Sequence, residues 1–132
     1  MKKIILIVLA VAVAAVIFYN SARPAVVSQG MSGGVIVWLK ATFGISLSQP
    51  VVRKLAHFME YALLGGLTFG ILRWKSVVLC GLYAVSDEVH QYFVPGRSCE
   101  VRDCIIDLCG VLTGVIIICL ITAGIEKRKR IS

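Results

Sequence analysis

Charged residues are scarce in this sequence: they make up 16% of its 132 positions, whereas 58% of the residues are hydrophobic. Ordinary soluble domains are only about half apolar. Because one helix needs roughly 20 apolar residues to cross the hydrocarbon layer of a membrane, this length allows about four crossings with short loops. It therefore leaves no room for a separate soluble domain.

Recognisable catalytic and metal-binding motifs are also missing. The five cysteines form no Cys-x-x-Cys pair and are odd in number, so no zinc or disulfide framework is indicated. The sequence contains no nucleophile elbow, phosphatase motif or standard metal triad. His57-x-x-Glu60 and Asp87-Glu88-x-His90 supply plausible ligand types but not a recognised zinc spacing. We therefore expect no metal and no other cofactor.

The net charge of +7 comes from fourteen Lys and Arg against seven Asp and Glu. The basic residues flank apolar blocks rather than alternating with aromatic residues on a soluble surface. This placement favours contact with lipid headgroups and a role in membrane topology over nucleic-acid binding. The expected partners are therefore membrane lipids and no nucleic acid, and the oligomeric state is left open.

The apolar blocks predict an all-α integral membrane bundle of four transmembrane helices. The expected spans are Ile4–Phe18, Leu55–Leu72, Ser76–Val94 and Asp103–Ile125. The first block also fits a signal peptide, but the residues after it offer no good small-x-small cleavage site. We therefore expect it to remain as an uncleaved helix of a cell-membrane protein.

The chain divides into four predicted regions: a first helix (1–20), an outer loop (21–50), a three-helix core (51–125) and a basic inner tail (126–132). Within the outer loop, apolar residues at helical spacing predict a short helix in the membrane interface, with an irregular loop as the alternative. The basic turn around Arg73 and Lys75 and the basic tail place both termini on the inner side.

Six of the seven acids and both histidines fall in one layer, at the outer ends of the predicted helices. The acids are Glu60, Asp87, Glu88, Glu100, Asp103 and Asp107. Ionisable groups inside hydrocarbon cost about 3 kcal/mol each on insertion scales, so they face the bundle interior and usually pair. Helical spacing puts several of them on shared faces, with His90 off the main face and Gly110 and Gly114 one turn below.

Three roles compete for this layer. It can be an ion-pair network that holds helix ends together. It can bind a lipid headgroup or phosphate, with Arg97 forking onto the phosphate and Lys54 as a point charge. It can also carry acid–base chemistry, for which the catalytic candidates are His57, Glu60, Asp87 and Glu88, with His57 and Glu60 as the pair.

Three segments resemble the motifs of VanZ-like membrane proteins in order and separation. They are Arg53–Tyr61 (RKLAHFMEY), Ser86–Arg97 (SDEVHQYFVPGR) and Asp103–Gly110 (DCIIDLCG), the last followed by Gly114. The resemblance covers about residues 51 to 114, which is half of the chain. The family often has Asn at the position that Asp107 occupies here.

The resemblance implies a helical protein of the bacterial cell envelope, and the family's namesake is associated with resistance to the glycopeptide teicoplanin. Transferred onto this chain, the motifs and the helical faces give one set of expected ligand-binding residues. The set is Lys54, His57, Glu60, Tyr61, Asp87, Glu88, Gln91, Arg97, Asp103 and Asp107. The first hypothesis is a pocket for a lipid or lipid-linked cell-wall precursor; the alternatives are a membrane-embedded enzyme and a structural or assembly subunit.

Overall fold

The computed structural model describes residues 2–131, which form helices joined by short loops. The helices are α1 (Lys2–Ser21), α2 (Ala25–Phe43), α3 (Gln49–Leu72), α4 (Lys75–Tyr92) and α5 (Val101–Ile131). The prediction of an all-α protein is confirmed. Met1 and Ser132, the outer ends of the predicted first helix and basic tail, lie outside the described residues.

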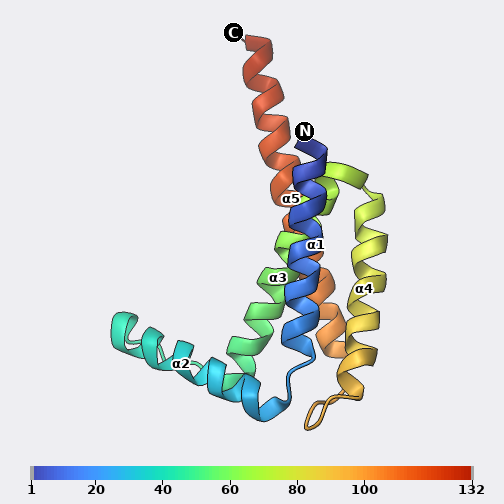
Figure 1. The fold of residues 1–132 in the computed structure, drawn as a ribbon. Helices are drawn as coiled ribbons and strands as arrows, with labels where there is room; N and C mark the ends of the chain where they lie inside the picture. The colour runs from blue at the N-terminus through green and yellow to red at the C-terminus, as the bar shows by residue number, and fades with distance from the viewer. Residues whose placement is uncertain (1, 132) are drawn as a thin grey trace.

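Helices α1, α3, α4 and α5 form a bundle, and α2 projects sideways from one end of it (Figure 1). Both chain ends lie at the opposite end, where α3 turns into α4 at Arg73 (Figure 1). The connection between α4 and α5 lies at the same end as the start of α2, and the Ala25 amide donates to the Pro95 carbonyl oxygen at 3.2 Å. The bundle therefore has two different ends, and the end near α2 collects the polar residues.

Three of the helices, α1, α3 and α5, are long and apolar enough to cross a membrane. Only 17%, 33% and 28% of their apolar windows are buried inside the protein, so most of these side chains are available to lipid. Helix α4 has 18 residues and carries Lys75, Asp87 and Glu88, which makes it less apolar. Of the four predicted spans, three are thus supported by length and composition, and the crossing by α4 stays a prediction.

The tightest packing in the bundle is between α3 and α5, along a seam of small residues. A Cβ atom on Gly65 would lie 2.6 Å from the Val111 carbonyl oxygen, and one on Gly114 would overlap the Ala62 carbonyl oxygen. A Cβ on Gly110 would likewise meet the backbone of α3. The prediction that Gly110 and Gly114 allow a close helix approach is confirmed, and α3 is the helix that approaches.

Helix α2 occupies the segment in which the sequence predicts a short helix, so a helix is confirmed over an irregular loop, but with 19 residues it is longer than predicted. Pro24 precedes it, and it ends at Gly44, which adopts the left-handed conformation with φ 69°. Its main packing partner is α3, and apolar side chains such as Val37 and Trp38 remain exposed. Its location in the membrane interface remains a prediction.

Candidate ligand-binding site

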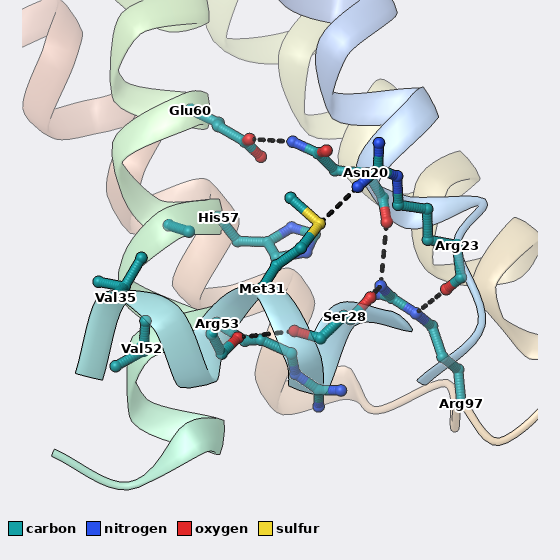
Figure 2. A pocket seen from close by; sticks show the side chains of 12 residues that line it. Asn20, Arg23, Ser28, Met31, Val35, Val52, Arg53, His57, Glu60 and Arg97 are labelled. Atoms are coloured by element: carbon teal, nitrogen blue, oxygen red, sulfur yellow. Dashed lines mark hydrogen bonds between the residues drawn. The ribbon is translucent and has the colours of Figure 1, made fainter. Parts of the chain in front are cut away.

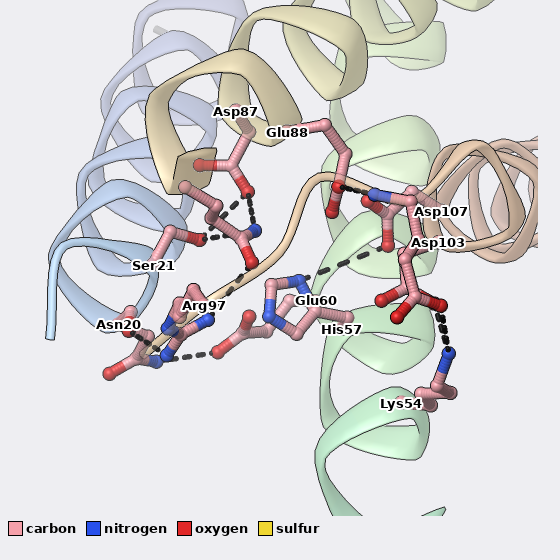
Figure 3. Close-up of polar contacts among 12 residues, drawn as sticks. Asn20, Ser21, Lys54, His57, Glu60, Asp87, Glu88, Arg97, Asp103 and Asp107 are labelled. Atoms are coloured by element: carbon pink, nitrogen blue, oxygen red, sulfur yellow. Dashed lines mark hydrogen bonds and ion pairs between the residues drawn. The ribbon is translucent and has the colours of Figure 1, made fainter. Parts of the chain in front are cut away.

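A set of polar side chains fills the end of the bundle near α2, and we call it the polar cluster. Helices α1, α3, α4 and α5 and the 93–100 loop all contribute to it (Figure 3). Its members are Asn20, Ser21, Lys54, His57, Glu60, Tyr61, Asp87, Glu88, Gln91, Arg97, Asp103 and Asp107. Three of its acids are almost completely buried: Asp87 and Glu88 are 2% exposed and Asp107 is 1% exposed.

Asp87 joins the end of α1 to α4. Its Oδ2 atom accepts a hydrogen bond from the Ser21 hydroxyl at 2.7 Å and another from the Gln91 amide nitrogen at 3.1 Å. Asp87 and Gln91 are four residues apart, so they lie one above the other on the same helix face. Because hydrogen bonds to a buried carboxylate are among the stronger ones, this contact fixes the position of the α1 terminus.

The side chain of Arg97, in the loop between α4 and α5, donates hydrogen bonds to four uncharged acceptors. Its guanidinium donates to the Arg23 and Asn20 carbonyl oxygens at 3.0 Å each, to Gln91 Oε1 at 3.0 Å and to the Ser28 hydroxyl at 2.6 Å. Burial lowers the pKa of this guanidinium below its ordinary value. Four of its five N–H groups are thus directed at protein atoms, and Arg97 connects the loop to α1, α2 and α4.

The histidine and glutamate of α3 have different partners from the pair that the sequence predicts. His57 Nδ1 lies 3.9 Å from Asp107 Oδ1, whereas Glu60 Oε1 accepts a hydrogen bond from the Asn20 amide at 2.7 Å (Figure 3). The two α3 side chains are three residues apart, but one turns toward α5 and the other toward α1. The structure therefore gives a His57–Asp107 pair in place of His57–Glu60.

Lys54 and the first turn of α5 form the more exposed side of the polar cluster. Lys54 makes an ion pair with Asp103, and its Nζ atom lies 3.9 Å from Glu100 Oε2. The Glu100 amide donates to Glu88 Oε2 at 3.0 Å, which ties the loop to α4. These contacts link α3, α4 and α5 across the same end of the bundle.

Three buried oxygen atoms of the polar cluster have no hydrogen-bond partner within the described residues: the Tyr61 hydroxyl, Asp87 Oδ1 and Asp107 Oδ2. Most buried polar atoms in native proteins are paired. Asp107 also lines a small cavity of about 20 Å³, which it shares with His57, Glu88 and others. This space is sufficient for one water molecule, which needs roughly 10–15 Å³.

A larger cavity of about 190 Å³ opens between α1, α2, α3 and Arg97, and we call it the outer cavity (Figure 2). Its apolar wall contains Met31, Val35, Val52 and Ala56. The polar residues on its lining are Asn20, Arg23, Ser28, Ser32, Arg53, His57, Glu60 and Arg97. The outer cavity thus combines apolar side chains with several guanidinium groups.

The ten residues predicted for the site come together in the polar cluster, but they do not all reach the outer cavity. Only His57, Glu60 and Arg97 line it, and the other seven lie deeper or on the Lys54 side. His90 lies apart, with its ring stacked on Phe18 at a centroid distance of 4.6 Å. Within residues 2–131 no group of three or more His, Cys, Asp or Glu is arranged to hold a metal ion.

Sequence reasoning missed the contribution of α1 and α2. Asn20 and Ser21 supply partners for Glu60 and Asp87, and Ser28 supplies one for Arg97. A signal was present, because Asn20 and Ser21 follow a long run of aliphatic and aromatic residues. Polar residues in the last turn of a spanning helix are expected to find partners within the bundle.

Long apolar helices that carry a buried polar cluster at one end define this chain as an integral membrane protein. The family model of VanZ/LLP1 matches residues 6–122, and the chain belongs to this family. The match extends beyond the three predicted motifs to include α2 and most of α1. The comparisons with curated proteins and with solved structures gave no match.

Proposed function

We propose that the outer cavity binds a lipid or lipid-linked ligand, and that the protein thereby contributes to glycopeptide (teicoplanin) resistance. One observation carries the proposal: the lining of a cavity of about 190 Å³ combines apolar side chains with three guanidinium groups. An amphiphile at the membrane surface likewise combines an apolar chain with a polar headgroup. Occupying or displacing such a ligand would alter the access of lipophilic glycopeptides to the cell surface.

The proposal includes a topology of four crossings with both termini inside. Figure 1 supports it, because α4 runs alongside the three long apolar helices and its two ends lie at opposite ends of the bundle. The end that carries both termini also has Arg73, Lys75 and the basic last turn of α5. Basic residues are retained on the inner side of membranes, so the outer cavity would face outward.

A cavity-filling variant tests the binding role. Ala56 lines the outer cavity, whereas its neighbour Leu55 is 47% exposed and does not. Teicoplanin sensitivity is compared in cells that express the wild type, Ala56→Trp or Leu55→Trp at equal membrane levels. We expect the wild type and Leu55→Trp to raise resistance and Ala56→Trp to abolish the increase. If the wild type did not raise teicoplanin resistance, the resistance role would be refuted. If Ala56→Trp gave full resistance, the role of the outer cavity in resistance would be refuted.

One contact favours an enzyme as the second candidate. His57 lines both cavities, and the Asp107 carboxylate lies 3.9 Å behind its imidazole. This distance is too long for a hydrogen bond. If the two groups closed to hydrogen-bonding distance on ligand binding, the carboxylate would orient the imidazole as a general base. Lipid extracts from cells with the wild type and with His57→Gln, compared by mass spectrometry, test this candidate. Identical lipid species in both extracts would exclude a reaction that depends on His57.

A further inference from the structure

We propose that Arg23 and Arg53 form a phosphate-binding arginine pair on the outer cavity, and that they hold the phosphate of a membrane amphiphile. This inference rests on the proposed lipid-binding function and assigns the ligand's chemical class. Arg23 follows α1, and Arg53 lies in the second turn of α3, so the two approach the cavity from different elements. Figure 2 shows both side chains on the lining, with the Arg23 guanidinium beside Asn20 and the Arg53 guanidinium on the far side of Ser28, so both flexible side chains would swing into the cavity to meet one phosphate.

The lining of the outer cavity carries an excess of positive charge. Three arginines line the outer cavity against one acid, Glu60, whose Oε1 atom already accepts from Asn20. In the part of the chain that the structure describes, none of the three guanidiniums makes a salt bridge with a carboxylate. Lys54, by contrast, contacts two acids. The outer cavity therefore concentrates positive charge that the protein itself does not neutralise.

The hydrogen bonds separate the three arginines into two roles. Arg97 directs its donors at Arg23 and Asn20 carbonyl oxygens and at two side chains, so it is a structural element of the wall. The Arg53 guanidinium makes no hydrogen bond to any described residue. Within the described residues, the Arg23 guanidinium donates a hydrogen bond only to the Met31 sulfur, a weak acceptor, and it also lies over the Tyr19 ring at 4.3 Å. Arg23 and Arg53 thus retain donors for a ligand.

The chemistry of these donors favours phosphate. A guanidinium presents two parallel N–H groups that match the spacing of phosphate oxygens, and such charge-assisted bonds are about twice as strong as neutral ones. The phosphate is also the group that anionic lipids place at the depth of the membrane surface. The aliphatic wall of Met31, Val35 and Val52 would then contact the adjoining apolar part of the same molecule.

The size of the cavity limits what enters it. Pockets that enclose a drug-sized ligand measure about 300–1,000 Å³. The outer cavity, at about 190 Å³, is smaller. It can take a phosphate with its neighbouring groups, but not a whole lipid or a glycopeptide antibiotic. The rest of the amphiphile would lie along the exposed apolar side chains of α2 and in the bilayer.

Binding of short-chain lipids to the purified full chain in detergent tests the arginine pair. The probes are dihexanoyl phosphatidic acid, dihexanoylglycerol, which lacks the phosphate, and inorganic phosphate. Native mass spectrometry reports the bound fraction. We expect phosphatidic acid to bind the wild type and the Arg23→Ala/Arg53→Ala variant to bind it more weakly by about tenfold or more, as the loss of charge-assisted hydrogen bonds implies.

The matched control is Arg102→Ala, which removes one positive charge from the same end of the bundle at an exposed position outside the cavity. We expect it to bind like the wild type. The Arg23→Lys/Arg53→Lys variant retains the charge but not the two-donor geometry. Its affinity for phosphatidic acid should therefore lie between that of the wild type and that of the double alanine variant. This second variant keeps the test decisive if the double alanine variant fails to fold.

The outcomes distinguish the inference from the function on which it rests. Wild-type binding of phosphatidic acid and dihexanoylglycerol with equal affinity would overturn the arginine pair but leave a lipid site. Binding of neither lipid would overturn both. If inorganic phosphate occupied the site as strongly as phosphatidic acid does, free phosphate would be the ligand. That result would overturn the inference that the ligand is an amphiphile. Unchanged affinity in the double alanine and double lysine variants would overturn the arginine pair directly.

Discussion

Arg97 and Asp87 are joined through a single side chain, because Gln91 accepts a hydrogen bond from Arg97 at 3.0 Å and donates one to Asp87 at 3.1 Å. This relay connects a loop guanidinium to a buried carboxylate without a direct ion pair between them. Since Ser21 also donates to Asp87, the relay ties α1, α4 and the loop together. It forms the back of the site, while Arg23 and Arg53 line its outer part.

Removing the Asp87 carboxylate should destabilise the protein more than neutralising it. Asp87→Ala leaves the Ser21 hydroxyl and the Gln91 amide without their acceptor, at a cost of about 1–3 kcal/mol. Asp87→Asn can keep an oxygen at the Oδ2 position and places its amide where Oδ1 has no partner. In detergent, the wild type and Asp87→Asn should therefore unfold at similar temperatures, and Asp87→Ala should unfold at a lower temperature. An Asn variant as unstable as Ala would show that the charge itself holds α1 and α4 together.

Adding a methyl group to the α3–α5 seam should separate the two helices. Gly114→Ala places a Cβ against the Ala62 carbonyl oxygen, so the backbones must move apart, and we expect a loss of about 1–3 kcal/mol. Gly124→Ala is the control, because nothing lies within 4 Å of its Cβ position. Unfolding in detergent measures both. Equal stability of the two variants would contradict the close approach of α3 and α5.

Cysteine labelling tests whether α4 crosses the membrane. Cys99 is exposed in the loop after α4, and Trp74 is 63% exposed just before it. In a chain whose other cysteines are replaced, a membrane-impermeant maleimide should label Cys99 in intact cells. In a Trp74→Cys variant without other cysteines, labelling should require permeabilised cells. Equal accessibility of both positions in intact cells would mean that α4 does not span.

The ion pair between Lys54 and Asp103 should contribute little to stability. Both side chains are partly exposed, at 31% and 27%, and pairs of this kind contribute about 0.2–1 kcal/mol. Lys54→Asp should destabilise the protein slightly, and Lys54→Asp/Asp103→Lys should recover most of the loss in unfolding measurements. If the reversed pair is no better than the single variant, the two residues act through other partners.

The helices could be predicted because aliphatic runs mark them directly, but their ends could not. The predicted span at Leu55 begins at Gln49 in the structure, since Arg53 and Lys54 lie inside the first turns of α3. At the other end, α5 continues through the basic residues to Ile131. Lys and Arg are good helix formers, so a change from apolar to basic residues does not end a helix.

The members of the polar cluster could be predicted from helical spacing, whereas their partners could not. Spacing along α3 places His57 and Glu60 on one face but does not say which neighbouring helix each will meet. The Gly110 and Gly114 seam fixes how α5 is rotated against α3, and that rotation brings Asp107 to His57. Glu60 instead accepts a hydrogen bond from Asn20 of α1, a helix that the family motifs do not include.

Photo-crosslinking from the cavity wall tests the central claim most directly. Val35 lines the outer cavity, and Val37, two residues later on α2, is 68% exposed away from it. A photoreactive amino acid is placed at either position in growing cells, and the crosslinked adducts are identified by mass spectrometry. We expect a phosphate-bearing lipid or lipid-linked species to be enriched at Val35 over Val37. The same adducts in equal amounts at both positions, or none at Val35, would contradict it.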